Sequence, residues 1–239
     1  MTDDLLRHAE LAANLEDVRS RIAAACGAAG RRPQDVTLIA VTKTWPTTDC
    51  LHLCELGVVD LAENRDGEAL QKAQETLGVV GGVRWHFVGQ LQRNKARSVA
   101  SYASVVQSVD RASLVTALSQ GAVRAERVVQ VLVQVSLAAD GDPHRGGADP
   151  VLLAELADQV EAADGLVLGG LMAVAPLGGD PFSAFTRLAE LGRALVQQHP
   201  QATMLSAGMS GDLEAAIVAG ATHVRVGTAL LGPRAAVLG

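Results

Sequence analysis

The stretch LIAVTKTWP, residues 38–46, places a lysine where a buried strand should end. Residues 38–41 form an apolar, partly β-branched run, which is typical of a strand buried on both faces. Trp45-Pro46 then interrupts regular structure, so Lys43 stands at the exit of the strand. Partial desolvation there would lower the pKa of the lysine and free its amine to attack a carbonyl group. The alternative is a lysine whose stem leads out of the sheet to solvent.

Two turns built from small residues occur near the C-terminus, SAGMSGD at 206–212 and VGTALLG at 226–232. Glycines allow backbone N–H groups to approach a ligand, and the N-terminus of a following helix carries partial positive charge. Because the two turns follow adjacent predicted strands and would lie opposite Lys43, we predict that they bind a phosphate group. Ordinary strand-to-helix turns, with Ser210 as a helix N-cap, are the alternative.

Arg225 narrows the chemistry that this lysine and phosphate site would serve. A Schiff-base lysine beside a phosphate implies a phosphorylated aldehyde or ketone, held either by a sugar-phosphate aldolase or by a protein that binds pyridoxal 5′-phosphate (PLP). Arg225 precedes Gly227 by two residues and is expected to point into the same mouth, where its guanidinium suits a ring nitrogen. An internal salt bridge from Arg225 to Glu63 or Asp212 is the alternative.

The elements that would position these residues alternate along the whole chain. An amphipathic helix over 4–26, ended by Gly27 and Gly30, comes first. The β-like runs follow at 36–42, 58–62, 83–88, 104–107, 128–136, 166–174, 202–206 and 222–226. The helix-like stretches between them lie near 47–56, 65–77, 92–101, 111–125, 150–163, 181–198 and 211–219.

Eight strands separated by helices pair in parallel through right-handed crossovers. The pattern therefore predicts an α/β fold, a single (β/α)8 TIM-type barrel domain over 1–239 with an extra N-terminal helix. An open doubly wound sheet is the alternative, but it needs a glycine-rich turn after the first strand, which VTKTWP lacks. The loop over 138–150 follows the fifth strand, and its His144 and Arg145 either contact an anion or are simply solvated.

Composition and charge exclude several classes of protein. The 239 residues are 49% hydrophobic and carry a net charge of −6, without the basic stripe that nucleic-acid binding needs. The acidic start MTDD does not resemble a secretion signal, and no apolar run reaches the roughly 18 residues of a membrane span. We therefore expect a cytoplasmic protein with no nucleic-acid or membrane partner.

The cysteines predict neither disulfides nor a metal site. Cys26, Cys50 and Cys54 are an odd set without framework spacing. In CLHLC, residues 50–54, the two cysteines would share one helix face while His52 points the opposite way at about 100° per residue. We interpret Cys50 and Cys54 as small apolar helix positions, and we expect no metal in this chain.

Six stretches together carry a resemblance to a known family: LIAVTKTWP, AENR, WHFVGQLQRNKA, QSVDR, GLMAVAP and LSAGMSGDLEAAIVAGATHVRVGTALLG. With them the chain resembles the PLP homeostasis protein family, single-domain relatives of the alanine racemase barrel, from the N-terminal helix to Gly232. The resemblance implies that Lys43 forms the internal aldimine with PLP and that Arg225 contacts the pyridine nitrogen. It further implies roles for the following residues: Asn64 beside the ring, Ser206 orienting Arg225, and Ser210, Gly227 and Thr228, with Met209 in the same loop, around the phosphate. His86 is either part of this set or a core histidine bonded to backbone.

The same resemblance implies a PLP-binding protein that stores, buffers or delivers the cofactor and is not an enzyme. A PLP-dependent amino-acid racemase is the alternative, and a Schiff-base aldolase is a third. We expect little racemase activity, because a protonated Arg225 makes the ring a poor electron sink. The chain also stops at Gly239 without a second domain to supply a tyrosine base, and its only tyrosine, Tyr102, falls on an outer helix. The expected ligands are PLP and amino acids, and the expected state is a monomer or at most a weak dimer.

Overall fold

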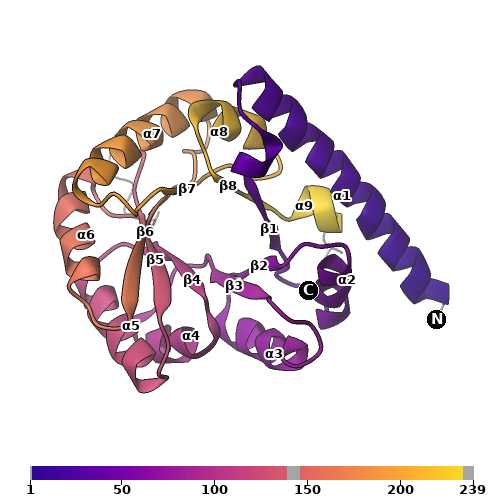
Figure 1. The fold of residues 1–239 in the computed structure, drawn as a ribbon, viewed down its shortest axis with the longest axis horizontal. Helices are drawn as coiled ribbons and strands as arrows, with labels where there is room; N and C mark the ends of the chain where they lie inside the picture. Colours follow the sequence, from indigo (N-terminus) through magenta and orange to yellow (C-terminus); the bar gives the residue numbers. More distant parts are fainter. Residues whose placement is uncertain (1, 139–145, 234–239) are drawn as a thin grey trace.

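The computed structural model describes residues 2–138 and 146–233 of the chain, and eight parallel strands close into a barrel in it (Figure 1). Each strand pairs with its neighbours in sequence order, and β8 returns to pair with β1. The strands are β1 (Thr37–Val41), β2 (Asp60–Glu63), β3 (Arg84–Phe87), β4 (Val105–Val109), β5 (Val129–Gln134), β6 (Leu166–Met172), β7 (Met204–Ser206) and β8 (His223–Val226). The predicted TIM-type barrel is therefore confirmed, and the open sheet is excluded.

Helices cross over between successive strands and form the outer ring of Figure 1. They are α2 (Thr47–Glu55), α3 (Asp66–Thr76), α4 (Ala96–Tyr102), α5 (Ala112–Arg124), α6 (Leu153–Glu161), α7 (Pro181–Gln198), α8 (Leu213–Ala219) and the short α9 (Thr228–Leu231). Short 3-10 helices lie at Pro33–Asp35, Arg93–Lys95 and Pro150–Leu152. No helix in the described ranges is long and apolar enough to cross a membrane.

The extra N-terminal helix α1 (Thr2–Ala28) lies outside the ring, along α2, α8 and α9 (Figure 1). The helix runs through Gly27 to Ala28, so Gly27 does not end it, but Gly30 follows the end of the helix in a left-handed conformation, as predicted. Its apolar stripe, Leu11, Leu15 and Val18, is buried. Polar contacts add to this packing: Asn14 donates to the Leu230 carbonyl. The helix therefore covers the junction between the last and first units of the barrel.

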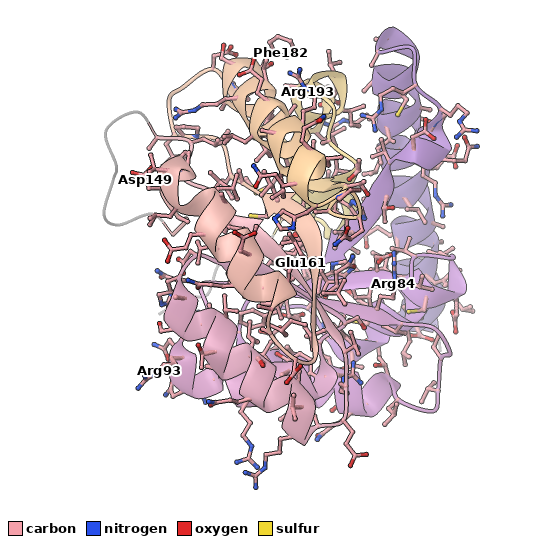
Figure 2. The ribbon with its side chains drawn as sticks, turned by 60° about the vertical axis from the view of Figure 1, so that its left-hand side comes forward. Arg84, Arg93, Asp149, Glu161, Phe182 and Arg193 are labelled. Carbon is pink, nitrogen blue, oxygen red and sulfur yellow. The ribbon has the colours of Figure 1, made fainter. Side chains whose placement is uncertain are left out.

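The core has two parts that differ in polarity. The larger part fills the space between strands and helices and contains most of the buried apolar side chains. A small apolar cluster of Val105, Leu132 and Met172 belongs to the barrel interior. Buried polar side chains from β3, β4, β7 and β8 share that interior, as described below. The outer helix faces are charged, as Glu161 and Arg193 show in Figure 2.

Candidate functional site

Strand register brings the predicted site residues together at the carboxyl ends of β8, β1 and β2. Ala40 of β1 pairs with Val226 of β8, and Val41 pairs with Ala62 of β2. The segments that follow these pairs hold Gly227, Lys43 and Asn64, so the three positions lie side by side at one rim. Enzyme and ligand sites of (β/α)8 barrels form at this end of the strands.

A strained turn holds Lys43. The residue after it, Thr44, has a φ of 71°, a left-handed conformation that is uncommon outside glycine. The Thr44 N–H donates to Oε1 of Glu68 on α3 at 2.6 Å, and the Trp45 N–H donates to the Thr42 carbonyl. Lys43 itself is half-buried. The turn is therefore fixed by α3 rather than by its own sequence alone.

Lys72 lies directly behind this turn, although a lysine on a surface helix is ordinarily exposed. Its Nζ donates to the Thr42 carbonyl at 2.8 Å and to carboxylate oxygens of Glu63 and Glu68 at 2.7 Å each. The residue is only 4% exposed. Burial acts to lower the pKa of Lys72, but the hydrogen bonds that it donates to the two carboxylates outweigh burial and raise the pKa. Lys72 thus stays charged and ties the ends of β1 and β2 to α3.

Arg225 is buried inside the barrel below the rim. It is 4% exposed, and its guanidinium donates to Ser206 Oγ at 2.8 Å and to the Ala173 carbonyl at 2.9 Å. The alternative of a salt bridge is not realised, since Glu63 is bound by Lys72 and no carboxylate oxygen of the described residues lies within 4.0 Å of Arg225. Burial lowers the pKa of Arg225 to about 10, so the group remains protonated near neutral pH.

A chain of buried hydrogen bonds links Arg225 to a carboxylate at the opposite end of the barrel. Ser206 Oγ donates to Gln107 Oε1 at 2.7 Å, and Gln107 Nε2 lies 2.9 Å from His86 Nδ1. His86 Nε2 in turn lies 2.8 Å from Asp60 Oδ1. Each link has one donor and one acceptor if His86 is neutral with its hydrogen on Nε2. His86 is thus bonded to side chains, not to backbone as one sequence-based alternative held.

The protonation states of His86 and Asp60 agree with this direction of the hydrogen bonds. Burial lowers the pKa of His86 despite the neighbouring Asp60, which keeps the imidazole neutral. Burial acts to raise the pKa of Asp60, but hydrogen bonds from His86 and Arg84 outweigh it and lower the pKa. The series of hydrogen bonds therefore begins at a cationic donor, Arg225, and ends at an anionic acceptor, Asp60. Every hydrogen bond between them is donated in the same direction.

The turns after β7 and β8 contact each other. Ser210 Oγ accepts from the Ala229 N–H at 3.2 Å, so it caps the first turn of α9. The N-cap residue of α8 is Asp212, which corrects the alternative role given to Ser210. Gly208 has a φ of +87°, and a Cβ there would lie 2.6 Å from the Ala216 side chain. Thr228 and Met209 are exposed beside this contact, the latter at 41%.

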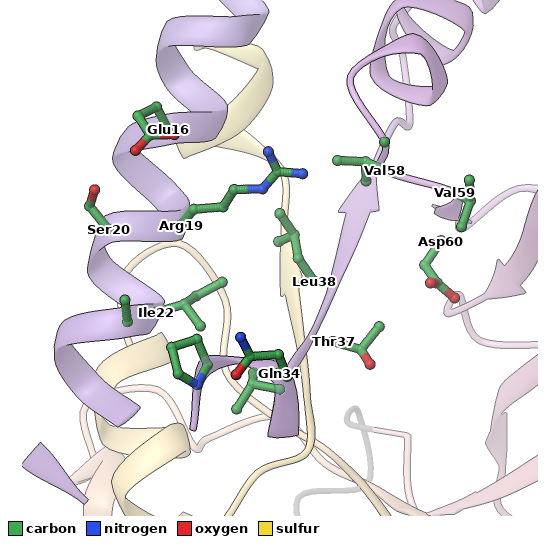
Figure 3. A pocket seen from close by; sticks show the side chains of 14 residues that line it. Glu16, Arg19, Ser20, Ile22, Gln34, Thr37, Leu38, Val58, Val59 and Asp60 are labelled. Atoms are coloured by element: carbon green, nitrogen blue, oxygen red, sulfur yellow. The ribbon is translucent and has the colours of Figure 1, made fainter. Parts of the chain in front are cut away.

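A separate cavity lies at the opposite, amino-terminal end of β1 and β2 (Figure 3). It is lined by α1 residues such as Glu16 and Arg19, by Leu38, and by Asp60. The predicted site residues do not reach it, but the hydrogen-bond chain does, through Asp60. His144 and Arg145, expected to contact an anion or solvent, lie outside the described residues.

The fold and this rim define a class. The family model described as alanine racemase, N-terminal domain, matches residues 9–235, and the chain belongs to that family. Within it the chain belongs to the pyridoxal phosphate homeostasis proteins. The protein of that name from Mycobacterium tuberculosis H37Rv is 46% identical over 246 residues, covering 95% of this chain and 94% of the relative. The one from Escherichia coli K12 is 36% identical, covering 94% and 97%.

Solved structures agree with this placement. PipY of Synechococcus elongatus PCC7942, solved with PLP bound, is 34% identical with a TM-score of 0.79, covering 93% of this chain and all of PipY. The crystal structure of an unknown protein from Bifidobacterium adolescentis reaches a TM-score of 0.87 at 30% identity, covering 94% of this chain and 96% of that one. An alanine racemase of Clostridium difficile 630 shares only 12% identity at a TM-score of 0.73 and covers 58% of that enzyme, which shows the fold alone.

Sequence reasoning missed three groups around the site: Lys72, Gln107 and Asp60. A lysine on an amphipathic helix normally faces water, and only the contacts of Lys72 with Thr42 and Glu63 of other elements reveal otherwise. Gln107 and Asp60 left a weak signal, because each is a polar residue inside a short strand whose other residues are buried. That signal indicates a buried polar network but not its members.

Proposed function

We propose that this protein binds PLP at the rim formed by β7, β8, β1 and β2 and serves in PLP homeostasis by storing, buffering or delivering the cofactor. The observation that carries the proposal is the placement of Lys43 beside the Gly227 turn, with the buried, carboxylate-free guanidinium of Arg225 below. The names of the curated relatives and the PLP-bound PipY structure support it. The proposal treats residues 1–239 as one PLP-binding barrel domain.

The residues present fit the cofactor. Lys43 would supply the amine for covalent attachment, and Asn64 would lie beside the ring. Arg225 donates toward the pyridine nitrogen while Ser206 holds its guanidinium in place. Ser210, whose oxygen already accepts from Ala229, still has its hydroxyl hydrogen to donate to a phosphate. Thr228 Oγ1, Gly227 and Met209 complete the two turns. Bound PLP would supply a reactive aldehyde and a ring able to accept electron density.

We propose further that the protein is not an enzyme. A protonated Arg225 would donate a hydrogen bond to the pyridine nitrogen and keep it unprotonated, which would weaken the ring as an electron sink. Racemisation also needs a proton donor on the face opposite the lysine. The one tyrosine of the chain, Tyr102, is buried at the end of α4, and burial raises the pKa of its hydroxyl. PLP-dependent racemisation remains the second candidate because of the shared fold.

Deuterium exchange separates the two candidates. We expect PLP-loaded protein in D₂O to leave the Cα hydrogen of L-alanine and other L-amino acids in place over hours. Exchange accompanied by the D-isomer, at the rate of about 1 s⁻¹ or more that ordinary enzymes reach, would establish a racemase.

Replacing Lys43 by alanine should abolish covalent attachment of PLP and leave the fold intact. The variants Lys43→Ala and Lys95→Ala are compared after borohydride reduction, by absorbance and by peptide mapping. Lys95 is the matched control, because its side chain is 53% exposed and its one ion pair among the described residues is with Asp66 at 3.7 Å. An adduct that maps to Lys72 or Lys95 in the wild-type protein would contradict the assignment.

The phosphate turns predict a strong preference for PLP over pyridoxal. Pyridoxal should bind far more weakly, and Thr228→Ala should cost about 0.5–3 kcal/mol of PLP binding, the range for a hydrogen bond to a charged group. Titration by fluorescence or absorbance measures both affinities. Equal affinity for PLP and pyridoxal would mean that these two turns do not bind the phosphate group.

The cytoplasmic location, the binding of amino acids and the monomeric or weakly dimeric state stay predictions. Gel filtration with light scattering tests the last of these directly.

A further inference from the structure

Three groups able to ligate a metal ion meet outside the barrel, where α1 packs against α2. His8 comes from α1, and His52 and Glu55 lie one turn apart on α2. Oε2 of Glu55 is 3.6 Å from Nε2 of His8 and 3.6 Å from Nδ1 of His52. All three donor atoms lie within 4.8 Å of one another. Two imidazoles and a carboxylate are a ligand set that binds zinc and leaves a fourth position for water.

The hydrogen bonding of His52 supplies an independent indication of a ligand. Its Nε2 lies 3.0 Å from Oδ1 of Asp4, an acceptor, so Nε2 carries the hydrogen and Nδ1 presents a lone pair. The residue is only 9% exposed, and Nδ1 has no hydrogen-bond partner among the described residues. This lone pair faces the Glu55 carboxylate, which is also an acceptor. A cation between them would satisfy both groups.

The distances require little adjustment. Ligands about 2 Å from a tetrahedral zinc ion are about 3.3 Å apart, so the two 3.6 Å separations are already close. The remaining movement toward the ion would be made by His8, because its side chain is 35% exposed. Its ring lies edge to face with that of His52, with the ring centroids 5.3 Å apart. Asp4 corresponds to the carboxylate that commonly orients a metal-binding histidine through its second nitrogen.

We propose that His8, His52 and Glu55 form a zinc-type metal site that joins α1 to α2, with Asp4 orienting His52. The site does not depend on the proposed PLP function. Sequence reasoning overlooked it because it tested His52 only against its neighbours on the same helix, whereas His8 is 44 positions away. A bound ion would restrain the helix pair beside the lysine turn, since Arg7, next to His8, bonds Asp49 and lies 4.6 Å over the Trp45 ring.

Cobalt(II) in place of zinc tests the site, because its visible spectrum reports the ligands. The chain of residues 1–239 without an affinity tag, saturated with PLP, is titrated with CoCl₂ and separately heated with and without ZnCl₂. We expect one Co²⁺ per chain with nitrogen and oxygen ligands, and a rise of several degrees in Tm with Zn²⁺. His8→Gln and His52→Gln should each weaken Co²⁺ binding at least tenfold, and Asp4→Asn about 10–100-fold.

His199→Gln is the matched control, a buried histidine paired with Asp158 and remote from the cluster. It should bind Co²⁺ like the wild-type protein, and circular dichroism verifies that every variant is folded. Three results would overturn the site: no Co²⁺ binding, equal binding by wild type and His52→Gln, or thiolate charge-transfer bands that assign the ion to Cys50 and Cys54. The first result would mean that a proton, not a metal ion, lies between His52 and Glu55.

Discussion

The ammonium group of Lys72 is almost fully buried, and oxygen atoms of three residues replace the water it has lost. Such an arrangement contributes little net stability as an intact group, because desolvation offsets most of the attraction. Removing one partner is different, since the charge that remains has neither water nor a counter-ion. The strength of this cluster therefore lies in how it fixes the Lys43 turn.

Lys72→Met should lower the free energy of unfolding by about 3–5 kcal/mol, the cost of leaving a buried charge without its partner. Glu63, which has no exposed surface, is the charge left behind. The double variant Lys72→Met with Glu63→Gln should regain part of this loss. Urea denaturation measures all three, and Lys95→Met is the control, expected within about 1 kcal/mol of wild type because that lysine is exposed. A loss of under 1 kcal/mol for Lys72→Met would contradict the buried ion cluster.

The contrast between Lys43 and Lys72 shows what residue types can predict. The position of Lys43 at the end of a buried strand was predictable, because an apolar run precedes it and a proline follows it. Sites in (β/α)8 barrels form at such strand ends. The burial of Lys72 was not predictable, because its environment is made by β1, β2 and the first turn of α3 together. Helical periodicity gives the face of a side chain but not whether a neighbouring loop covers that face.

At the scale of elements, five strands contribute to one polar chain inside the barrel. Arg225, Ser206, Gln107, His86 and Asp60 belong to β8, β7, β4, β3 and β2. A single continuous hydrogen-bond direction means that the Arg225 guanidinium is oriented by a carboxylate at the other end of the barrel. Gln107 connects the two parts of this hydrogen-bond series, because it bonds Ser206 on one side and His86 on the other.

Gln107→Leu should weaken PLP binding by about 1–3 kcal/mol, because Ser206 and His86 each lose a buried partner and Arg225 loses its fixed orientation. The absorption maximum of bound PLP should shift as well, since Arg225 is the proposed partner of the ring nitrogen. A purely structural role would not move that band. Ser108→Ala is the control on the same strand: its hydroxyl is buried and has no hydrogen-bond partner among the described residues, so its loss should change neither property. An unchanged affinity and spectrum for Gln107→Leu would contradict the positioning role.

The elements themselves were largely predictable, and their ends were not. All eight apolar runs are strands, because both faces of a closed parallel sheet are buried and the chain must be apolar there. The seventh run, predicted over 202–206, forms a strand only at Met204–Ser206. The β6–β7 pairing also requires Gly170, where a Cβ would approach the Met204 carbonyl to 2.0 Å. Such close approaches depend on how strands meet and cannot be read from either strand alone.

At the scale of the whole molecule, α1 and the residues just after it join the first unit of the barrel to the last units. Arg7 bonds Asp49 on α2 and the Leu231 carbonyl of α9, while Arg31 donates to the Ile217 and Ala221 carbonyls at the end of α8. The lysine turn lies between α2 and α9 at the rim. By holding α2 and α9 from outside the ring, α1 therefore supports the site without contributing a residue to it.

Two neutral histidines, the buried His86 and the half-buried His223, make the stability of the whole barrel depend on pH. Burial lowers the pKa of His223 to about 4, and burial also lowers the pKa of His86. An unfolded histidine titrates near 6.5, so between pH 6.5 and pH 4 the unfolded chain binds protons that the folded chain does not. This contribution to stability is complete above about pH 6.5 and is lost as the pH falls toward 4.

The free energy of unfolding should therefore decrease between pH 7 and pH 5, with His223 alone contributing about 2 kcal/mol at 1.36 kcal/mol per pKa unit. Urea denaturation at pH 7, 6 and 5 measures this slope. His223→Gln should show a shallower slope, because the glutamine cannot take up a proton in the unfolded state. Stability that stays constant from pH 7 to pH 5, or equal slopes for wild type and His223→Gln, would mean that His223 is not held neutral inside the barrel.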